Sequence, residues 1–143
     1  SGNTLPLVIF GLKAKSEQIR AVSKIALVPG WFGINEPVTF GMPIMYNPIL
    51  CIPYVLNVIV VMACTLFMYK IGFLVPGFVP IMTLMPMGFG SFLSTLRWQN
   101  AIWDYLTMIP AGLVWYPFFK VYDNQLYKKE QEAKAAEAAA AKA

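Results

Sequence analysis

Long uncharged, apolar segments dominate the pattern along this chain. Pro37–Tyr69 and Ile71–Leu96 contain no charged residue, and Trp98–Phe119 contains only Asp104. A helix needs about 20 apolar residues to cross a bilayer, so the first and third segments predict two membrane-spanning helices. The composition, 58% hydrophobic and 13% charged, agrees with an all-α integral membrane protein in a lipid bilayer.

The middle segment, Ile71–Leu96, has a different character. Its glycines and prolines are Gly72, Pro76, Gly77, Pro80, Pro86, Gly88 and Gly90. This density is incompatible with a plain spanning helix. Non-helical backbone of this hydrophobicity is tolerated in a membrane only when it is buried in protein or lines a cavity. We therefore predict a re-entrant hairpin that enters and leaves on the side of Lys70 and Arg97.

The region before the first span predicts shorter elements. Lys13–Leu27 carries apolar residues at helical spacing with charges on the other face, which indicates a short amphipathic helix at the membrane interface. Val28–Pro37 contains two prolines and two glycines and predicts a loop, with Asn35 as the N-cap of the next helix. Prolines then follow at Pro43, Pro48 and Pro53, which predicts a broken or kinked approach to the span.

The net charge of +4 is distributed unevenly. One basic cluster comprises Lys13, Lys15, Arg20 and Lys24, and a second comprises Lys120, Lys128, Lys129, Lys134 and Lys142. The positive-inside rule places both clusters in the cytoplasm. We expect an even number of crossings between them, and a cytoplasmic C-terminus. Because topology explains most of the positive charge, no nucleic-acid partner is predicted.

The two ends of the chain predict less about the fold. Residues 128–143 are only Lys, Glu, Gln and Ala, a strongly helix-forming mixture without an apolar stripe. We divide the chain into a membrane unit, residues 1–127, and a solvated tail, residues 128–143. At the other end, Leu5–Leu12 is apolar but too short to cross a bilayer. It resembles part of a longer helix, so we expect further membrane segments or partner subunits.

Asn35 and Glu36 are the first candidate site, since Glu36 is the only acid between Arg20 and Trp103. A charge at bilayer depth costs at least about 2.5–3.5 kcal/mol, so an acid there indicates a functional site. The Asn35 amide donates and accepts hydrogen bonds while an ionised Glu36 accepts them, which suits a hydroxyl-rich ligand. In the structural alternative, Asn35 caps a helix and Glu36 interacts with the helix dipole.

Other chemistry is not indicated by the sequence. Asp104 lies near Arg97 among interfacial tryptophans and is interpreted as a structural acid at a helix N-terminus. There is no histidine, and Cys51 and Cys64 lack the flanking pattern of a metal site. No catalytic residue, metal site or cofactor is predicted.

Several sequence blocks resemble a known family. They are Pro29-Gly30, Gly33-Ile34-Asn35-Glu36-Pro37-Val38, Phe40-Gly41-Met42-Pro43, Asn47-Pro48-Ile49-Leu50 and Tyr116-Pro117-Phe118-Phe119-Lys120-Val121-Tyr122-Asp123. These blocks are similar to the enzyme IIC membrane component of the bacterial phosphoenolpyruvate-dependent sugar phosphotransferase system, of the lactose/cellobiose/diacetylchitobiose type. The similarity extends from Ser1 to about Lys129.

The resemblance implies a homodimeric, multi-pass permease in the bacterial inner membrane, with this chain supplying the C-terminal part of its transport domain. Such a permease binds a β-linked disaccharide and presents it to the cytoplasmic IIB component, which works with IIA. The resemblance assigns sugar binding to Glu36, with Asn35 beside it, and makes Thr83 a candidate contact from the hairpin. The alternatives are a membrane scaffold or assembly subunit without sugar binding, or a channel-type pore.

Overall fold

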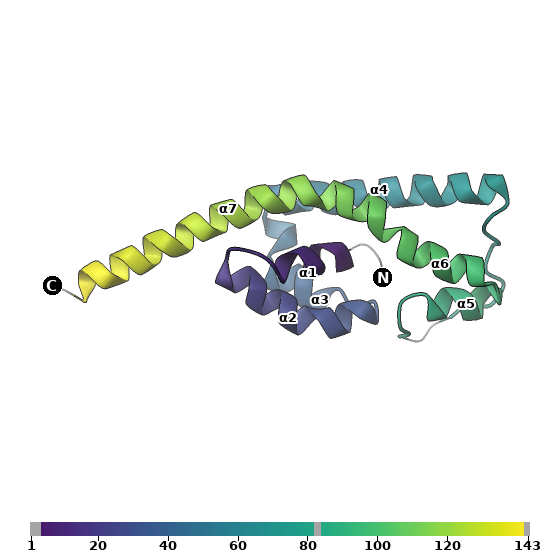
Figure 1. The fold of residues 1–143 in the computed structure, drawn as a ribbon, viewed down its shortest axis with the longest axis horizontal. Helices are drawn as coiled ribbons and strands as arrows, with labels where there is room; N and C mark the ends of the chain where they lie inside the picture. The colour runs from purple at the N-terminus through teal and green to yellow at the C-terminus, as the bar shows by residue number, and fades with distance from the viewer. Residues whose placement is uncertain (1–3, 82–83, 142–143) are drawn as a thin grey trace.

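In the computed structural model, which describes residues 4–81 and 84–141, these residues form seven α-helices and one 3₁₀ turn, with no strand among them. The elements are α1 (Leu5–Gly11), α2 (Glu17–Trp31), α3 (Glu36–Gly41), the 3₁₀ turn η1 (Ile44–Tyr46), α4 (Pro48–Ile71), α5 (Phe89–Thr95), α6 (Trp98–Leu106) and α7 (Met108–Ala140). Figure 1 shows α4 and α7 along one side of the molecule, α1 to α3 grouped below them, and α5 and α6 at the far end of α4. The predicted all-helical class is therefore confirmed.

α4 is the long apolar helix that the sequence predicts as the first span. Its start is fixed by Asn47, whose side chain accepts a hydrogen bond from the Ile49 backbone N–H at 3.0 Å, and by Pro48, which needs no partner in the first turn. The helix has 24 residues and continues through Pro53. Among residues 4–81 and 84–141, α4 is the one helix long and apolar enough to cross a membrane.

The end of α2 differs from the prediction, because Pro29 and Gly30 lie inside the helix and not in a loop. Pro29 removes only one hydrogen bond close to the helix end, which the remaining turns tolerate. The helix stops at Gly33, which has a φ of 85°. The Ile34 N–H then bonds the Pro29 carbonyl at 2.9 Å and the Gly33 N–H bonds the Gly30 carbonyl at 3.1 Å. These bonds form a Schellman motif that turns the chain toward α3.

The apolar core lies where α1, α2, α3, the start of α4 and the middle of α7 meet. Its buried members include Leu7, Val8, Ile19, Ala26, Val38, Met42, Ile44, Leu50, Trp115 and Phe119. The far half of α4 contributes little, and Ile59, Met62 and Phe67 on it are exposed. Only 17% of its most apolar stretch is buried. An exposed apolar surface of this length suits a lipid bilayer or neighbouring membrane segments.

The second predicted span is not one continuous helix. α6 ends at Leu106 and α7 begins at Met108, with Thr107 between them. Pro110 explains the interruption, because it has no N–H for the Leu106 carbonyl and its ring crowds that carbonyl. Figure 1 shows the resulting change of direction between α6 and α7. A single helix over Trp98–Phe119 is therefore wrong, although α6 and the first turns of α7 still form one bent apolar element.

Residues 72–81 and 84–88 contain no helix and fold back against α5 and α6. The Phe78 and Val79 N–H groups both donate to the Ser94 carbonyl, at 3.1 and 3.3 Å. Nearer the start of the irregular segment, the Asn100 side chain of α6 donates to the Val75 carbonyl at 2.8 Å and accepts from the Val75 N–H at 3.3 Å. The irregular backbone agrees with the predicted hairpin, whereas its re-entry into a membrane stays a prediction.

Asp123 of α7 binds the start of α2. Its side chain is 7% exposed, and its two carboxylate oxygens accept hydrogen bonds from the backbone N–H groups of Lys15 and Ser16, each at 3.0 Å. Ser16 is the N-cap of α2, so its N–H has no partner inside the helix, and the Lys15 N–H lies directly before the helix. The carboxylate also lies at the positive end of the α2 dipole. Asp123 therefore acts as a cap supplied by a distant helix.

Glu130 extends this contact into the tail. Its Oε1 atom accepts hydrogen bonds from Ser16 Oγ at 2.5 Å and from the Gln18 N–H at 3.1 Å. Its Oε2 atom accepts from the Glu17 N–H at 3.1 Å. Partial burial acts to raise the pKa of Glu130, but these hydrogen bonds and the nearby Lys134 charge outweigh burial and lower that pKa below its ordinary value of 4.5. The start of the tail is thus held against α2.

Lys134 adds an exposed ion pair with Glu17 at 3.0 Å, and the hydrogen bond in this pair raises the pKa of Lys134. Such exposed pairs contribute little stability by themselves. Residues 128, 129 and 131–141 are exposed, as expected of a solvated tail, whereas Glu130 is partly buried and contacts the start of α2. The predicted boundary between residues 127 and 128 lies inside α7, which is continuous there; a separate tail unit stays a prediction.

Candidate functional site

Asn35 precedes α3, but its side chain does not cap that helix in the described part of the chain. Its backbone carbonyl accepts the first helical bonds, from the N–H groups of Val38 at 3.1 Å and Thr39 at 2.9 Å. Its side-chain Oδ1 atom instead accepts a hydrogen bond from Thr4 Oγ1 at 2.6 Å. The structural alternative for Asn35, a side-chain N-cap, is therefore wrong. Its amide takes part in a different, tertiary contact.

Glu36 is the first residue of α3 and its side chain is exposed. It lines an open hollow of about 550 Å³ together with Gly33, Ile34, Pro37, Phe40 and Leu84. Apart from Glu36, these lining side chains are apolar or absent. A carboxylate at the wall of an apolar hollow can accept hydrogen bonds from a polar solute that lies against the apolar wall. The dipole of α3 adds only a small favourable contribution.

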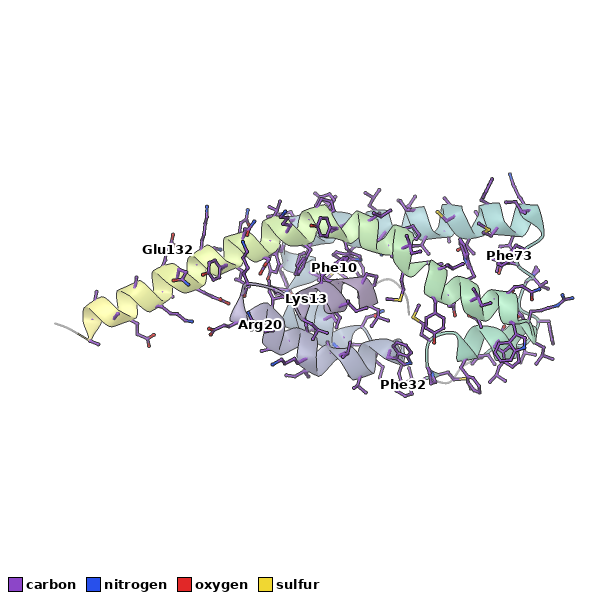
Figure 2. The ribbon with its side chains drawn as sticks, in the orientation of Figure 1. Phe10, Lys13, Arg20, Phe32, Phe73 and Glu132 are labelled. Atoms are coloured by element: carbon purple, nitrogen blue, oxygen red, sulfur yellow. The ribbon has the colours of Figure 1, made fainter. Side chains whose placement is uncertain are left out.

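Backbone contacts join the end of α2 to the irregular segment. The Met87 N–H donates to the Trp31 carbonyl at 3.0 Å, and the Tyr105 hydroxyl donates to the Met87 carbonyl at 2.8 Å. The rings of Trp31 and Tyr105 lie 5.9 Å apart. Figure 2 shows Phe32 at this end of α2, facing the irregular segment. Two segments that are separate in sequence are thus brought together beside Glu36.

A second cavity, of about 580 Å³ and likewise open to the outside, lies against the irregular segment. Its lining includes Phe32 directly after α2, Leu84 and Met85 from the irregular segment, and Ser91 and Asp104 from α5 and α6. Leu84 lines both this cavity and the Glu36 hollow. The irregular segment therefore forms part of the wall of both the Glu36 hollow and the second cavity. Thr83, the candidate contact from this segment, lies outside the described residues.

Asp104 lies elsewhere than the sequence predicts. It is the seventh residue of α6, near the C-terminal end of that helix, and it accepts a short hydrogen bond from Ser91 Oγ. The interpretation as an acid at a helix N-terminus is therefore wrong, because the helix starts at Trp98 and ends soon after Asp104. Asp104 ties α5 to α6, and it does not line the hollow that contains Glu36.

Two polar residues at the site were missed in the sequence. Thr4, which is 0% exposed, reaches Asn35 across 31 positions, and Ser91 reaches Asp104 across 13. No local sequence pattern around a single Thr or Ser predicts which distant residue its hydroxyl will bond. Within the described residues, no group of three or more His, Cys, Asp or Glu side chains is placed to hold a metal ion.

The fold and the site together define a class of protein. An apolar helix of spanning length, a broken helix that carries an acid, and irregular backbone lining cavities are features of membrane transport proteins with discontinuous helices. Comparison with known proteins gives the family. Residues 1–58 match the family "Phosphotransferase system, EIIC". This chain belongs to the EIIC family of the phosphotransferase system, as the sequence resemblance indicates, and that membership places it in a membrane.

Similarity to individual proteins agrees with this family. The chain is 33% identical over 144 residues to the lichenan permease IIC component of Bacillus subtilis (strain 168), covering 99% of this chain and 32% of the relative. It is 37% identical over 128 residues to the lactose-specific EIICB component of Lacticaseibacillus casei, covering 82% and 21%. The crystal structure of ChbC, the IIC component of the N,N'-diacetylchitobiose-specific system, matches with a TM-score of 0.84 and 31% identity, over 90% of this chain and 30% of ChbC. The chain thus spans about a third of the length of the first two curated relatives it matches.

Proposed function

We propose that this chain forms the sugar-binding part of a phosphotransferase permease for a β-linked disaccharide of the cellobiose, lactose or chitobiose kind. The observation that carries the proposal is Glu36, a carboxylate at the wall of an apolar hollow, with Asn35 directly before it in the sequence. Glu36 accepts a hydrogen bond from a sugar hydroxyl and Asn35 donates one. Thr83 is retained as a further contact, on the ground that its neighbour Leu84 lines the same hollow.

The proposal includes partners and a location. The permease works as a homodimer in the bacterial inner membrane and presents the bound sugar to IIB, which receives its phosphoryl group from IIA. The named functions of the relatives support this assignment, since they are IIC components for lichenan, oligo-β-mannoside and lactose. Further membrane segments complete the transport domain, because the chain equals 32% of the lichenan permease in length.

Protection of a cysteine from chemical labelling by a bound disaccharide separates this function from the scaffold alternative. A cysteine at Phe40, which lines the Glu36 hollow, is introduced in the full-length permease after Cys51 and Cys64 are replaced by Ser. We expect cellobiose, lactose or N,N'-diacetylchitobiose to slow its modification by a maleimide. Maltose, with an α-linkage, should not. A cysteine at Tyr46, which is exposed but outside the hollow, is the control. Equal modification rates at Phe40 with every sugar would favour the scaffold. Protection of this cysteine in the absence of IIB and IIA is explained by sugar binding alone and needs no channel.

The proposed topology places both basic clusters in the cytoplasm and Lys70 on the other side. Contacts of Glu130 and Lys134 with the start of α2 support the first part, since they bring the two clusters to the same end of the molecule. We expect an impermeant reagent added to intact cells to label a cysteine at Lys70. It should not label a cysteine at Lys15 or Glu130. Labelling of Glu130→Cys from outside would contradict the topology.

The same experiment examines the re-entrant hairpin. If residues 71–96 re-enter the membrane and line the transport cavity, a cysteine at Leu84 is accessible to water-soluble reagents in the intact permease. The cavities that Leu84 lines support this expectation. Complete inaccessibility of Leu84→Cys to such reagents, from either side of the membrane, would contradict the hairpin.

A further inference from the structure

An open groove of about 560 Å³ lies between α4 and α6 and shares no lining residue with the Glu36 hollow. Figure 1 shows these two helices diverging from the junction of α6 with α7 toward the C-terminal end of α4. The α4 side of the groove extends from Asn57 to Tyr69, which is about 18 Å at about 1.5 Å per residue. Half of a hydrocarbon core of about 30 Å is about 15 Å, so the groove is about as long as one leaflet is deep.

The wall of this groove suits hydrocarbon. Apolar side chains of α4 line it at helical spacing, and they are Val58, Val61, Met62 and Leu66. The hydroxyl of Thr65 donates to the Val61 carbonyl at 2.8 Å and accepts from the Trp103 indole N–H at 3.0 Å. Other polar side chains on the wall also form hydrogen bonds inside the protein, namely Ser91, Asn100, Asp104 and Thr107. Because these polar groups already have partners, the groove fits an acyl chain better than a sugar.

Two cations lie at one end of the groove. On α4, Met62 and Leu66 line the groove four residues apart, and Lys70 is the next position of that row. On α6, Asn100 lines the groove, and Arg97 precedes it by three positions at the N-cap. Both basic side chains are exposed, and within residues 4–81 and 84–141 neither of them belongs to an ion pair. The groove therefore combines an apolar floor with two positive charges at its wide end.

We propose that this groove binds an anionic phospholipid of the surrounding bilayer, with an acyl chain between α4 and α6 and the phosphate at Lys70 and Arg97. The family membership of this chain places it in a membrane, so lipid is the solvent of an apolar groove that opens beside α4. Lys and Arg side chains extend along apolar surface and place their charge at the headgroup level, where each attracts anionic lipid. A zwitterionic phospholipid has the same acyl chains, but its ammonium group opposes the attraction of its phosphate to both cations.

Fluorescence quenching by brominated lipid tests the site, because Trp103 lines the groove. The full-length permease is reconstituted in phosphatidylcholine vesicles that contain increasing fractions of phosphatidylglycerol with brominated acyl chains. Bromine quenches tryptophan only at short range, and the signal of Trp103 is the difference between the wild type and Trp103→Phe. A gain of about fivefold per cation predicts that this lipid quenches Trp103 at a fraction about thirtyfold lower than brominated phosphatidylcholine does.

Neutral variants identify the two charges. Lys70→Gln and Arg97→Gln should each reduce the preference for phosphatidylglycerol to about fivefold, and the double variant should abolish it. Equal quenching by the two brominated lipids in the wild type would show contact with bulk lipid only, and would overturn the proposal. Absence of quenching by either lipid would show that another segment of the permease or a second copy covers the groove, and would overturn it as well.

Val58, on the groove wall, and Ile59, which is exposed but does not line the groove, offer a matched pair of substitutions. Val58→Phe should fill the groove and weaken the quenching of Trp103 by phosphatidylglycerol, whereas Ile59→Phe should leave it unchanged. If Trp103→Phe does not fold, native mass spectrometry of the detergent-purified permease replaces fluorescence. The wild type should then retain one more phosphatidylglycerol per protomer than the Lys70→Gln/Arg97→Gln variant, and equal retention would overturn the proposal.

Discussion

Replacing Glu36 with Gln should raise the KM for disaccharide uptake by about one to two orders of magnitude. A hydrogen bond to a charged acceptor contributes about 1.5–3 kcal/mol, and about 1.4 kcal/mol corresponds to a factor of ten in affinity. Glutamine has nearly the same size, so the apolar hollow around position 36 keeps its shape. The side chain is exposed, and within residues 4–81 and 84–141 it makes no hydrogen bond or ion pair that the substitution would break. Expression and dimerisation should therefore be unchanged.

Asp104→Asn is the matched control, since it removes the other charge from the apolar segments. The asparagine oxygen can still accept the Ser91 hydrogen bond that ties α5 to α6. Asp104 does not line the Glu36 hollow, so uptake should change far less than in Glu36→Gln. A larger loss in Asp104→Asn than in Glu36→Gln would show that the wrong acid has been assigned to the sugar.

Asp123→Ala should cause the largest loss of stability among the substitutions considered. The substitution leaves two backbone N–H groups without their carboxylate, that of Ser16, which is buried, and that of Lys15, which is partly buried. Loss of such charge-assisted bonds costs about 3 kcal/mol, and on that basis we expect the melting temperature of the detergent-solubilised permease to fall by about 5 °C or more. The measurement is thermal unfolding followed by circular dichroism or by a thiol-reactive dye.

Asn124→Ala provides a neighbouring control for Asp123. Asn124 is exposed, and its one described contact is a 3.5 Å hydrogen bond from the Lys15 ammonium group, so its removal should leave the melting temperature within about 1 °C. If Asp123→Ala and Asn124→Ala melt together with the wild type, Asp123 does not hold α2 in the intact protein.

Much of the fold can be predicted from local signals. The apolar run up to Tyr69 predicts α4 itself, whereas its start at Pro48 is not predicted, because Pro43, Pro48 and Pro53 by themselves indicate only a broken or kinked approach. The glycines and prolines of 71–96 predict irregular backbone, because each acts on the nearest residues alone. Each of these features depends on residues a few positions apart.

The errors arise where tertiary contacts or helix ends modify local preference. Pro29 was expected to break α2, but so near the helix end it removes only one bond, and Gly33 forms the actual stop. In the opposite direction, the effect of Pro110 was overlooked, although it interrupts the second predicted span. A proline's consequence thus depends on how many turns follow it.

The candidate site also divides into residues that local sequence signals predict and residues that depend on tertiary contacts. Asn35 and Glu36 could be chosen from the sequence because an acid in an apolar segment stands out by itself. Thr4 and Asp123 could not, since each acts on backbone or side-chain groups that are distant in sequence. Nothing local to Asp123 indicates that it caps a helix 107 positions earlier.

Isothermal titration of the purified full-length permease with cellobiose, lactose and N,N'-diacetylchitobiose tests the central claim most directly. The account predicts that at least one of these β-linked disaccharides binds the wild type, that Glu36→Gln binds it about ten to a hundred times more weakly, and that Asp104→Asn stays close to the wild type. Equal affinity of the wild type and Glu36→Gln for the bound sugar would contradict the assignment of Glu36 as the sugar-binding carboxylate.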